Sequence, residues 1–196
     1  MPTRIGVFIF EGAEELDFVG PWEVLRVWAG MFPDDQVEVY TIAPTTEPIT
    51  CAQGLKVIAD HTVDAAPEFD VLVYPGGMGN RAFIGDEAHR SWLQKNAARG
   101  ALMTSVCTGS LVYADAGLLN GRPATTHWQW LEMLKQLGTD VEPRETDRFV
   151  DSGEVITAAG VSAGIDMALH LVKRLSSEET AKQVRRMIQY DPAPPV

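Results

Sequence analysis

The chain has 196 residues, of which 45% are hydrophobic and 22% are charged, a composition typical of a globular protein with a full core. Its formal net charge is −11, so a nucleic acid backbone would be repelled, and we expect no nucleic acid partner. No apolar run is long enough to predict a membrane span or the core of a signal peptide, so we expect no membrane partner. We therefore predict a single, soluble, cytoplasmic domain over residues 1–196.

Short apolar runs typical of strands alternate along the chain with longer segments typical of helices. In the first hundred residues we predict strands at Ile5–Phe10, Val37–Ala43, Leu55–Ala59 and Val71–Tyr74, and helices at Asp17–Met31 and Glu87–Arg99. In the second half we predict strands at Ala101–Val106 and 141–146, a strand or loop at Ala124–His127, and a hairpin of Arg148–Val150 with Val155–Ala159. We also predict helices at Leu111–Leu119, Gln129–Leu137 and Ala163–Leu175, and a last helix that follows Ser176–Glu179 and runs to about Tyr190. This alternation predicts an α/β fold with an open, mostly parallel sheet that is covered by helices on both faces.

Three segments predict helix ends. Ser162 is expected to cap the helix that follows it, and Ser176–Glu179 matches a capping box at the start of the last helix. Asp191–Val196 contains three prolines, which cannot continue a helix, so it predicts a tail.

One stretch combines a predicted buried strand, a single cysteine and a change from strand-like to helix-like spacing of the apolar residues. The strand before Cys107 gives way to small residues, Thr108 to Ser110, that open a helix. A cysteine at the tip of a strand-to-helix turn has the arrangement of a nucleophile elbow. The helix start would favour thiolate over thiol, so we interpret Cys107 as a nucleophile. The alternative is that Cys107 is a small buried hydrophobic residue.

Ligand sites in parallel sheets form where loops leave the carboxyl ends of the strands, and three predicted loops therefore converge on Cys107. The first loop holds Asp17, whose apolar neighbours Leu16 and Phe18 suggest that its carboxyl faces the pocket. Burial would raise the pKa of Asp17 and let it act as a general acid. Asp17 could instead be a helix N-cap.

The other two loops, and a later histidine, offer further candidates. The amides of Gly76 and Gly77 would bind a substrate atom in the manner of an oxyanion hole, or form an ordinary turn. Thr108 adds a hydroxyl and an amide after the nucleophile, or caps the helix. His127 would line the pocket or act as a base, or be structural. The remaining histidines and Cys51 have no metal-ligand spacing, so we predict no metal and no organic cofactor.

Several motifs, taken together, resemble the DJ-1/PfpI superfamily. They occur in the order of that family and span nearly the whole chain: Gly12–Asp17 with Gly20–Pro21, Tyr74–Gly77, Ser105–Ser110, Gly117–Leu119, Ala124–Trp128 and Gly160–Asp166. Within the superfamily, Ser105–Ser110 and Ala124–Trp128 are most similar to isonitrile hydratases and to the effector-like domains of AraC-type regulators.

This resemblance implies a flavodoxin-like α/β sandwich, a homodimer and a cysteine on a strained elbow. In the hydratases, the positions that match Cys107, Asp17 and Thr108 are the nucleophile, its acid/base partner and a supporting residue. The implied reaction adds water to an isonitrile through a cysteine thioimidate and releases an N-substituted formamide. Threonine after the cysteine, and aspartate at position 17, depart from the protease and DJ-1-like members.

Two other functions remain open for such a chain. One is a non-enzymatic effector-binding or regulatory module, although the acidic charge and the lack of a basic helix-turn-helix segment before Val196 disfavour direct DNA regulation. The other is a different cysteine-dependent enzyme on the same fold, such as a glyoxalase or an amidase-like hydrolase.

Overall fold

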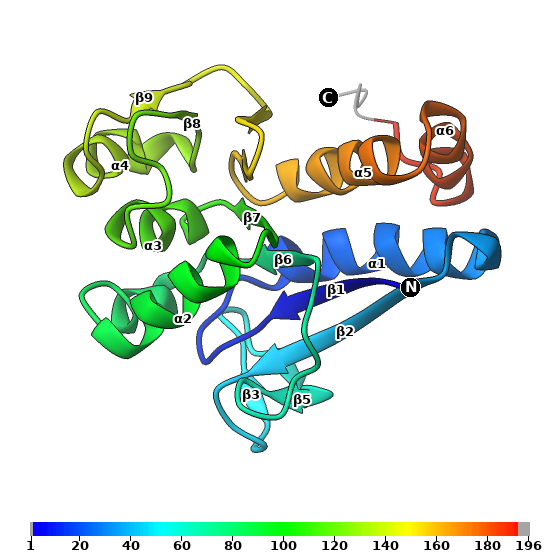
Figure 1. Cartoon of the computed structure of the whole chain (residues 1–196), viewed down its shortest axis with the longest axis horizontal. Helices are drawn as coiled ribbons and strands as arrows, with labels where there is room; N and C mark the ends of the chain where they lie inside the picture. Colours follow the sequence, from blue (N-terminus) through cyan, green and yellow to red (C-terminus); the bar gives the residue numbers. More distant parts are fainter. Residues whose placement is uncertain (1, 192–196) are drawn as a thin grey trace.

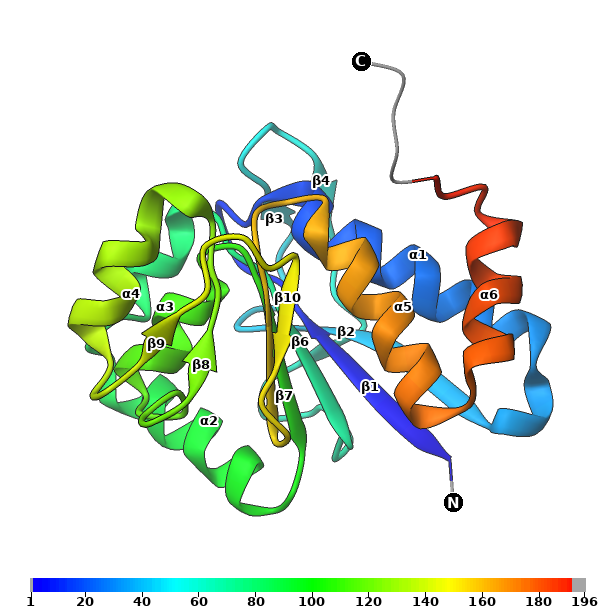
Figure 2. The same ribbon diagram turned by 90° about the horizontal axis from the view of Figure 1, so that it is seen from above.

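The computed structural model describes residues 2–191, which form an α/β sandwich around a seven-stranded sheet (Figures 1 and 2). The strand order is β10-β11-β7-β6-β1-β2-β5. The strands are β1 (Thr3–Phe8), β2 (Val37–Ala43), β5 (His61–Thr62), β6 (Val71–Tyr74), β7 (Leu102–Val106), β10 (Phe149–Asp151) and β11 (Val155–Ala158). Every neighbouring pair is parallel except the β10–β11 hairpin, which confirms the predicted mostly parallel sheet.

Helices cover both faces of this sheet. They are α1 (Glu15–Met31), α2 (Glu87–Ala98), α3 (Gly109–Asp115), α4 (Leu131–Leu137), α5 (Ala163–Leu175) and α6 (Glu178–Met187), with short 3₁₀ turns η1 (Pro33–Asp35), η2 (Met78–Ala82) and η3 (Trp128–Trp130). Figure 2 shows α1, α5 and α6 on one side of the strands and α2, α3 and α4 on the other. None of these helices is long and apolar enough to cross a membrane within residues 2–191.

The central strands place the loops of the candidate site. Every residue of β6 and β7 is buried, as expected for parallel strands covered on both faces. The loop after β6 begins at Pro75, and Cys107 follows the last residue of β7 directly. The register pairs Tyr74 with Ser105, so both loops leave the sheet at the same level. Their backbones therefore start next to each other.

Several helix ends differ from the predictions. The helix expected at Leu111–Leu119 begins at Gly109 and ends at Asp115, because the backbone turns at Gly117 with a φ of +75°. The last helix ends at Met187 and is capped by Ser177 and not by Ser176. Ser162 makes no side-chain cap; its hydroxyl instead accepts a hydrogen bond from Arg148.

The short strands were the least predictable elements. The segments predicted at Leu55–Ala59, Ala124–His127 and 141–146 contain only two-residue strands, β4 (Lys56–Val57), β8 (Pro123–Ala124) and β9 (Glu142–Pro143), in small sheets β3–β4 and β8–β9. The partner of β4 is β3 (Ile49–Thr50), and the edge strand β5 was not predicted. Pro143 cannot donate to a ladder, so β9 stops there. The predicted tail beyond Asp191 lies outside the described residues.

Candidate active site

Cys107 lies on a strained turn between β7 and α3. Its φ is +55°, a left-handed conformation that is uncommon for residues with a side chain. Its N–H donates to the carbonyls of Ala158 and Ala159, at 3.1 and 2.9 Å, on the neighbouring strand end. Its carbonyl accepts hydrogen bonds from the hydroxyls of Thr126 and Ser110, at 2.9 and 3.1 Å. The surrounding bonds hold the strained conformation, as expected for a nucleophile elbow.

Asp17 is fully buried, although it is a carboxylic acid. It lies inside the first turn of α1, whose N-cap is Glu14, so the alternative interpretation of Asp17 as a helix cap is wrong. Its Oδ2 accepts a hydrogen bond from the N–H of Gly76 at 2.8 Å. Its Oδ1 is buried with no partner at hydrogen-bond geometry within residues 2–191, although the Cys107 thiol is near enough to lower the Asp17 pKa. Burial outweighs both effects and raises the pKa of Asp17 to about 7.

The thiol of Cys107 is also harder to ionise than a free cysteine. Burial, and next the charge of Asp17, raise the pKa of Cys107 to about 12, while N–H groups of Val161 and Thr108 act in the opposite direction. The N–H of Thr108 at the helix start does lower this pKa, as expected, but desolvation is the larger effect and the net pKa is raised. Between pH 7 and pH 12 the two acids hold a single proton between them.

The amides of Gly76 and Gly77 are engaged within the protein. Gly76 donates to Asp17, and Gly77 donates to the hydroxyl oxygen of Thr108 at 3.1 Å. The expected oxyanion role does not fit this geometry, because neither N–H is free for a substrate atom. These amides position the two side chains instead. A Cβ at position 76 would lie 2.6 Å from Thr108 Oγ1 and 2.9 Å from Asp17 Oδ2, so only glycine fits there.

Thr108 is bound by a residue that the sequence did not single out. The amide nitrogen of Asn80, in η2, donates to the Thr108 carbonyl at 2.7 Å and to its hydroxyl oxygen at 3.0 Å. Thr108 occupies the N-cap position of α3, but its side chain makes no capping hydrogen bond. The only sequence signal for Asn80 was its place directly after the glycine-rich loop that follows β6.

A cavity of about 400 Å³ opens over Cys107. It is lined by Gly12, Glu14, Ala52, Gln53, Gly77, Met78, Cys107, Thr108, His127, Gln129, Trp130 and Val161. His127 lines this cavity, as predicted. Its Nδ1 accepts a hydrogen bond from the N–H of Gln129 at 3.3 Å, and its ring stacks on Trp128 at a centroid distance of 5.7 Å. The sequence-predicted residues Cys107, Thr108, Gly77 and His127 therefore share one cavity, with Asp17 buried beside it.

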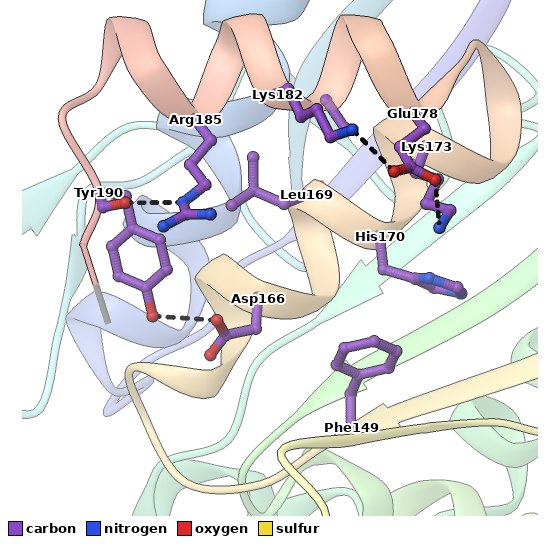
Figure 3. Close-up of a pocket in the computed structure, with 10 residues that line it drawn as sticks. Phe149, Asp166, Leu169, His170, Lys173, Glu178, Lys182, Arg185 and Tyr190 are labelled. Carbon is purple, nitrogen blue, oxygen red and sulfur yellow. Dashed lines mark hydrogen bonds and ion pairs between the residues drawn. The ribbon is translucent and has the colours of Figure 1, made fainter. Parts of the chain in front are cut away.

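Another cavity, of about 360 Å³, lies between α5 and α6 (Figure 3). Its charged groups bind one another, within α6 and between the two helices. Glu178 pairs with Lys173 and Lys182 at 3.0 and 2.9 Å, and the Tyr190 hydroxyl donates to Asp166 at 3.1 Å. Asp166, the last residue of the motif Gly160–Asp166, lines this cavity, but none of the residues predicted to carry chemistry does, so we place the candidate active site at Cys107. Within residues 2–191, no group of three or more His, Cys, Asp or Glu side chains is arranged to hold a metal ion.

Comparison with known families identifies the family of the chain. The pattern that defines the DJ-1/PfpI family matches residues 3–174. The chain belongs to the DJ-1/PfpI family. The resemblance noted from the motifs is thereby confirmed at the family level.

Two relatives show how far this DJ-1/PfpI chain extends. Isonitrile hydratase from Pseudomonas putida is 38% identical over 195 residues, which cover 100% of this chain and 82% of the hydratase. The HTH-type transcriptional regulator GbdR from Pseudomonas aeruginosa is 27% identical over 190 residues, which cover 97% of this chain but only 51% of the regulator. The chain thus spans most of one relative and about half of the other.

Solved DJ-1/PfpI structures share the fold. A ThiJ/PfpI family protein from Pseudomonas syringae superposes with a TM-score of 0.89 at 32% identity, covering 100% of this chain and 78% of that chain. Drosophila melanogaster DJ-1beta superposes with a TM-score of 0.86 at 22% identity, covering 97% of this chain and 100% of that chain. These comparisons confirm the predicted flavodoxin-like sandwich.

Proposed function

We propose that this DJ-1/PfpI protein is an isonitrile hydratase-like enzyme that converts R–N≡C and water into an N-substituted formamide. The observation that carries the proposal is the pair of Cys107 and Asp17, a strained cysteine and a buried carboxyl with a raised pKa beside one cavity. The identity of 38% with isonitrile hydratase from Pseudomonas putida supports the choice of reaction.

The first half of the reaction needs one proton and one nucleophile. In the resting pair the thiol holds its proton, and moving that proton to Asp17 creates the thiolate together with the acid. The thiolate sulfur forms a bond to the terminal isonitrile carbon while Asp17 gives its proton to that carbon. The product is an enzyme thioimidate, R–N=CH–S–Cys107, and Asp17 is again ionised. The N–H groups of Val161 and Thr108 stabilise negative charge on the sulfur before the attack.

The second half uses the ionised Asp17 as a base. Asp17 takes one proton from water as the water oxygen bonds to the thioimidate carbon, and passes this proton to the nitrogen. The carbon–sulfur bond then breaks, the proton of the new hydroxyl moves through Asp17 to the sulfur, and R–NH–CHO leaves. The sum is one isonitrile plus one water giving one formamide. Because the same carboxyl serves as acid and then as base, a pKa near neutrality suits both steps.

The proposal predicts which side chains the reaction requires. Formamide production is measured from a small aryl and a small alkyl isonitrile, with wild type beside Cys107→Ala, Asp17→Asn and Thr108→Val. We expect Cys107→Ala to be inactive and Asp17→Asn to lose roughly 100-fold or more in kcat, in line with the loss of a general acid–base. Cys51→Ala is the matched control, because Cys51 is buried on the loop between β3 and β4, outside the residues that line the cavity.

The control separates a general defect from a specific one. Cys51→Ala should keep wild-type turnover. If wild type produces no formamide while Cys107 still reacts with a thiol probe, the hydratase proposal fails. If Cys107→Ala keeps its turnover, the nucleophile assignment fails.

A regulatory module is the second candidate, because nearly the full length of this chain matches about half of GbdR. That function predicts tight binding of a small molecule at the Cys107 cavity with no chemical change. Calorimetric binding combined with product analysis of the same mixture distinguishes it from the enzyme.

A further inference from the structure

Asn80 holds Thr108 in a way that fixes the direction of every hydrogen bond between them. A carbonyl oxygen can only accept a hydrogen bond, so the Asn80 group at 2.7 Å from the Thr108 carbonyl must be its NH₂. On the other side, a guanidinium can only donate, so the group that Arg81 contacts at 3.0 Å must be the Asn80 amide oxygen. The Asn80 side chain is fully buried, and its orientation is therefore determined by its two neighbours.

This arrangement determines what the Thr108 hydroxyl has left to offer. Its oxygen accepts one hydrogen bond from the Asn80 NH₂ at 3.0 Å and a second from the N–H of Gly77 at 3.1 Å. A hydroxyl oxygen has two acceptor positions and one hydrogen. Since both acceptor positions are occupied, the hydroxyl hydrogen is the remaining group, and Thr108 lines the cavity over Cys107. The Thr108 hydroxyl is thereby held as a donor.

Arg81 fixes Asn80 and also brings a positive charge to the site. Its guanidinium lies 4.4 Å from the centre of the Trp130 ring, which lines the cavity. One nitrogen, Nη1, donates to Asn80, while Nη2 is buried and has no hydrogen-bond partner within residues 2–191. The guanidinium is near enough to Cys107 for the two groups to interact electrostatically. A half-buried cation with an unused donor near a cysteine favours the thiolate.

We propose that Asn80 and Arg81 are positioning residues of the Cys107 site. Asn80 keeps the Thr108 hydroxyl as a hydrogen-bond donor to a substrate nitrogen next to the carbon that Cys107 attacks. Arg81 holds the Asn80 amide and supports negative charge on the sulfur. The role of the Thr108 donor rests on the proposed hydratase reaction, in which that nitrogen becomes protonated, whereas the effect of Arg81 on the sulfur does not depend on the substrate.

Four charged or titratable groups surround Cys107 from the elements packed against it. Asp17 comes from α1 and Glu14 from the loop before α1, and both oppose ionisation of the thiol. Arg81 comes from η2, and His127 comes from the segment before η3 and lines the same cavity. Among these groups Arg81 is the permanent cation, so removing it should move the pH dependence of Cys107 in one direction.

The first test measures the thiolate directly and needs no isonitrile. The rate of Cys107 alkylation by iodoacetamide is followed from pH 7 to pH 10 in Cys51→Ala protein, so that Cys107 is the one cysteine in the chain. We expect Arg81→Met to slow alkylation at pH 8 by roughly tenfold, since one pKa unit corresponds to a tenfold change in thiolate. Arg81→Lys should recover part of that rate, because it keeps the charge. Asn80→Asp should also slow alkylation, because Thr108, whose N–H faces the sulfur, loses its anchor.

A matched variant controls for loss of an arginine as such. Arg90→Met removes an arginine of α2 that pairs with Asp115, at 3.1 Å, and does not line the cavity. It should leave the alkylation profile unchanged. If Arg81→Met and Arg90→Met give the same profile, the charge role of Arg81 is wrong. Thermal unfolding of each variant shows whether a changed rate reflects a changed fold.

The second test asks whether Asn80 acts through the Thr108 hydroxyl. Asn80→Asp and Thr108→Val are made singly and together, and kcat and KM for an isonitrile are measured. We expect each single variant to lower kcat by roughly tenfold or more with little change in KM, as when a transition-state donor is lost. In the Thr108→Val background, Asn80→Asp should lower kcat by clearly less than it does alone, because only its effect on the Thr108 backbone is left. If the fold-changes in kcat of the two single variants simply multiply in the double variant, Asn80 does not act through the Thr108 hydroxyl.

The two tests separate this proposal from the proposed function. If wild type turns over no isonitrile, the hydratase reaction fails, and the alkylation profiles still decide whether Asn80 and Arg81 set the state of Cys107. If isonitriles are turned over and neither kcat nor alkylation responds to these substitutions, the positioning role is overturned while the hydratase proposal stands.

Discussion

Asp17 and Cys107 are two acids buried side by side, and burial disfavours the charged form of each. The fold nevertheless supplies N–H groups to whichever of the two is ionised. Gly76 donates to Asp17, while Val161 and Thr108 face the sulfur. The negative charge of the pair can therefore move between oxygen and sulfur without leaving a charge unsupported. That mobility suits a cysteine that exchanges its proton with a neighbouring carboxyl.

The burial of Asp17 predicts a cost in stability that depends on pH. Its pKa is about 7 when folded and 3.8 as its ordinary value, so folding favours the protonated form. The stability contribution is fully present below pH 3.8 and is lost as pH rises through 7, by ~4 kcal/mol at most. We expect Asp17→Asn to gain stability over wild type between pH 4 and pH 8, measured by urea unfolding. If the free energies of unfolding of Asp17→Asn and wild type differ by the same amount at pH 4 and at pH 8, the description of Asp17 as a buried acid is wrong.

At the scale of elements, the junction between β7 and α3 depends on how closely two backbones approach. A Cβ at Gly109 would lie 2.5 Å from the carbonyl oxygen of Tyr74, the last residue of β6. Only glycine lets α3 start directly against the neighbouring strand. The turn that carries Cys107 is therefore fixed by packing between elements as well as by its own residues.

Helix starts offer a test at the same scale. The Ser177 hydroxyl accepts a hydrogen bond from the N–H of Thr180 at 3.0 Å and so caps α6, whereas Ser162 precedes α5 without capping it. We expect Ser177→Ala to lower the free energy of unfolding by about 1 kcal/mol, the usual value of such a cap. Ser162→Ala is the matched control and should cost clearly less. Equal losses in urea unfolding would show that the Ser177 hydroxyl is not an effective cap.

At the scale of the whole molecule, an aromatic cluster under α2 contains a half-buried histidine. His89 Nε2 lies 2.9 Å from the hydroxyl of fully buried Tyr74, and the rings of Phe8, Phe83 and Trp92 lie within 5.4 Å of the His89 ring. Burial lowers the pKa of His89 to about 4. The histidine is therefore neutral in the folded protein at neutral pH.

This histidine predicts acid sensitivity of global folding. The unfolded chain binds a proton at His89 near pH 6.5 and the folded protein only near pH 4, so stability falls as pH drops from 6.5 towards 4. Replacing the pair together, with His89→Phe and Tyr74→Phe, should flatten this part of the stability curve, measured by thermal unfolding at a series of pH values. If stability depends on pH in the same way after both substitutions, groups other than His89 cause the dependence.

Much of the fold and the centre of the site could be predicted from the sequence. The bounds of β2 and β6 agree with the predicted strands, because a buried parallel strand is a short, almost wholly apolar run. The order of strands and helices also placed Cys107, Asp17 and Thr108 close together, since loops at the carboxyl ends of parallel strands meet at one edge. A homodimer stays a prediction of the family resemblance.

The tertiary structure decided the electrostatics and the remaining partners. Nothing local to Cys107 shows that burial raises its pKa, because desolvation depends on all the atoms that exclude water from the sulfur. The roles of the Gly76 and Gly77 amides were missed for a similar reason, since their acceptors are distant in sequence. Asn80 and Arg81 follow a loop with no periodic signal of their own. Periodicity and motif order are properties of the chain, whereas hydrogen-bond partners and burial exist only after folding brings distant residues together.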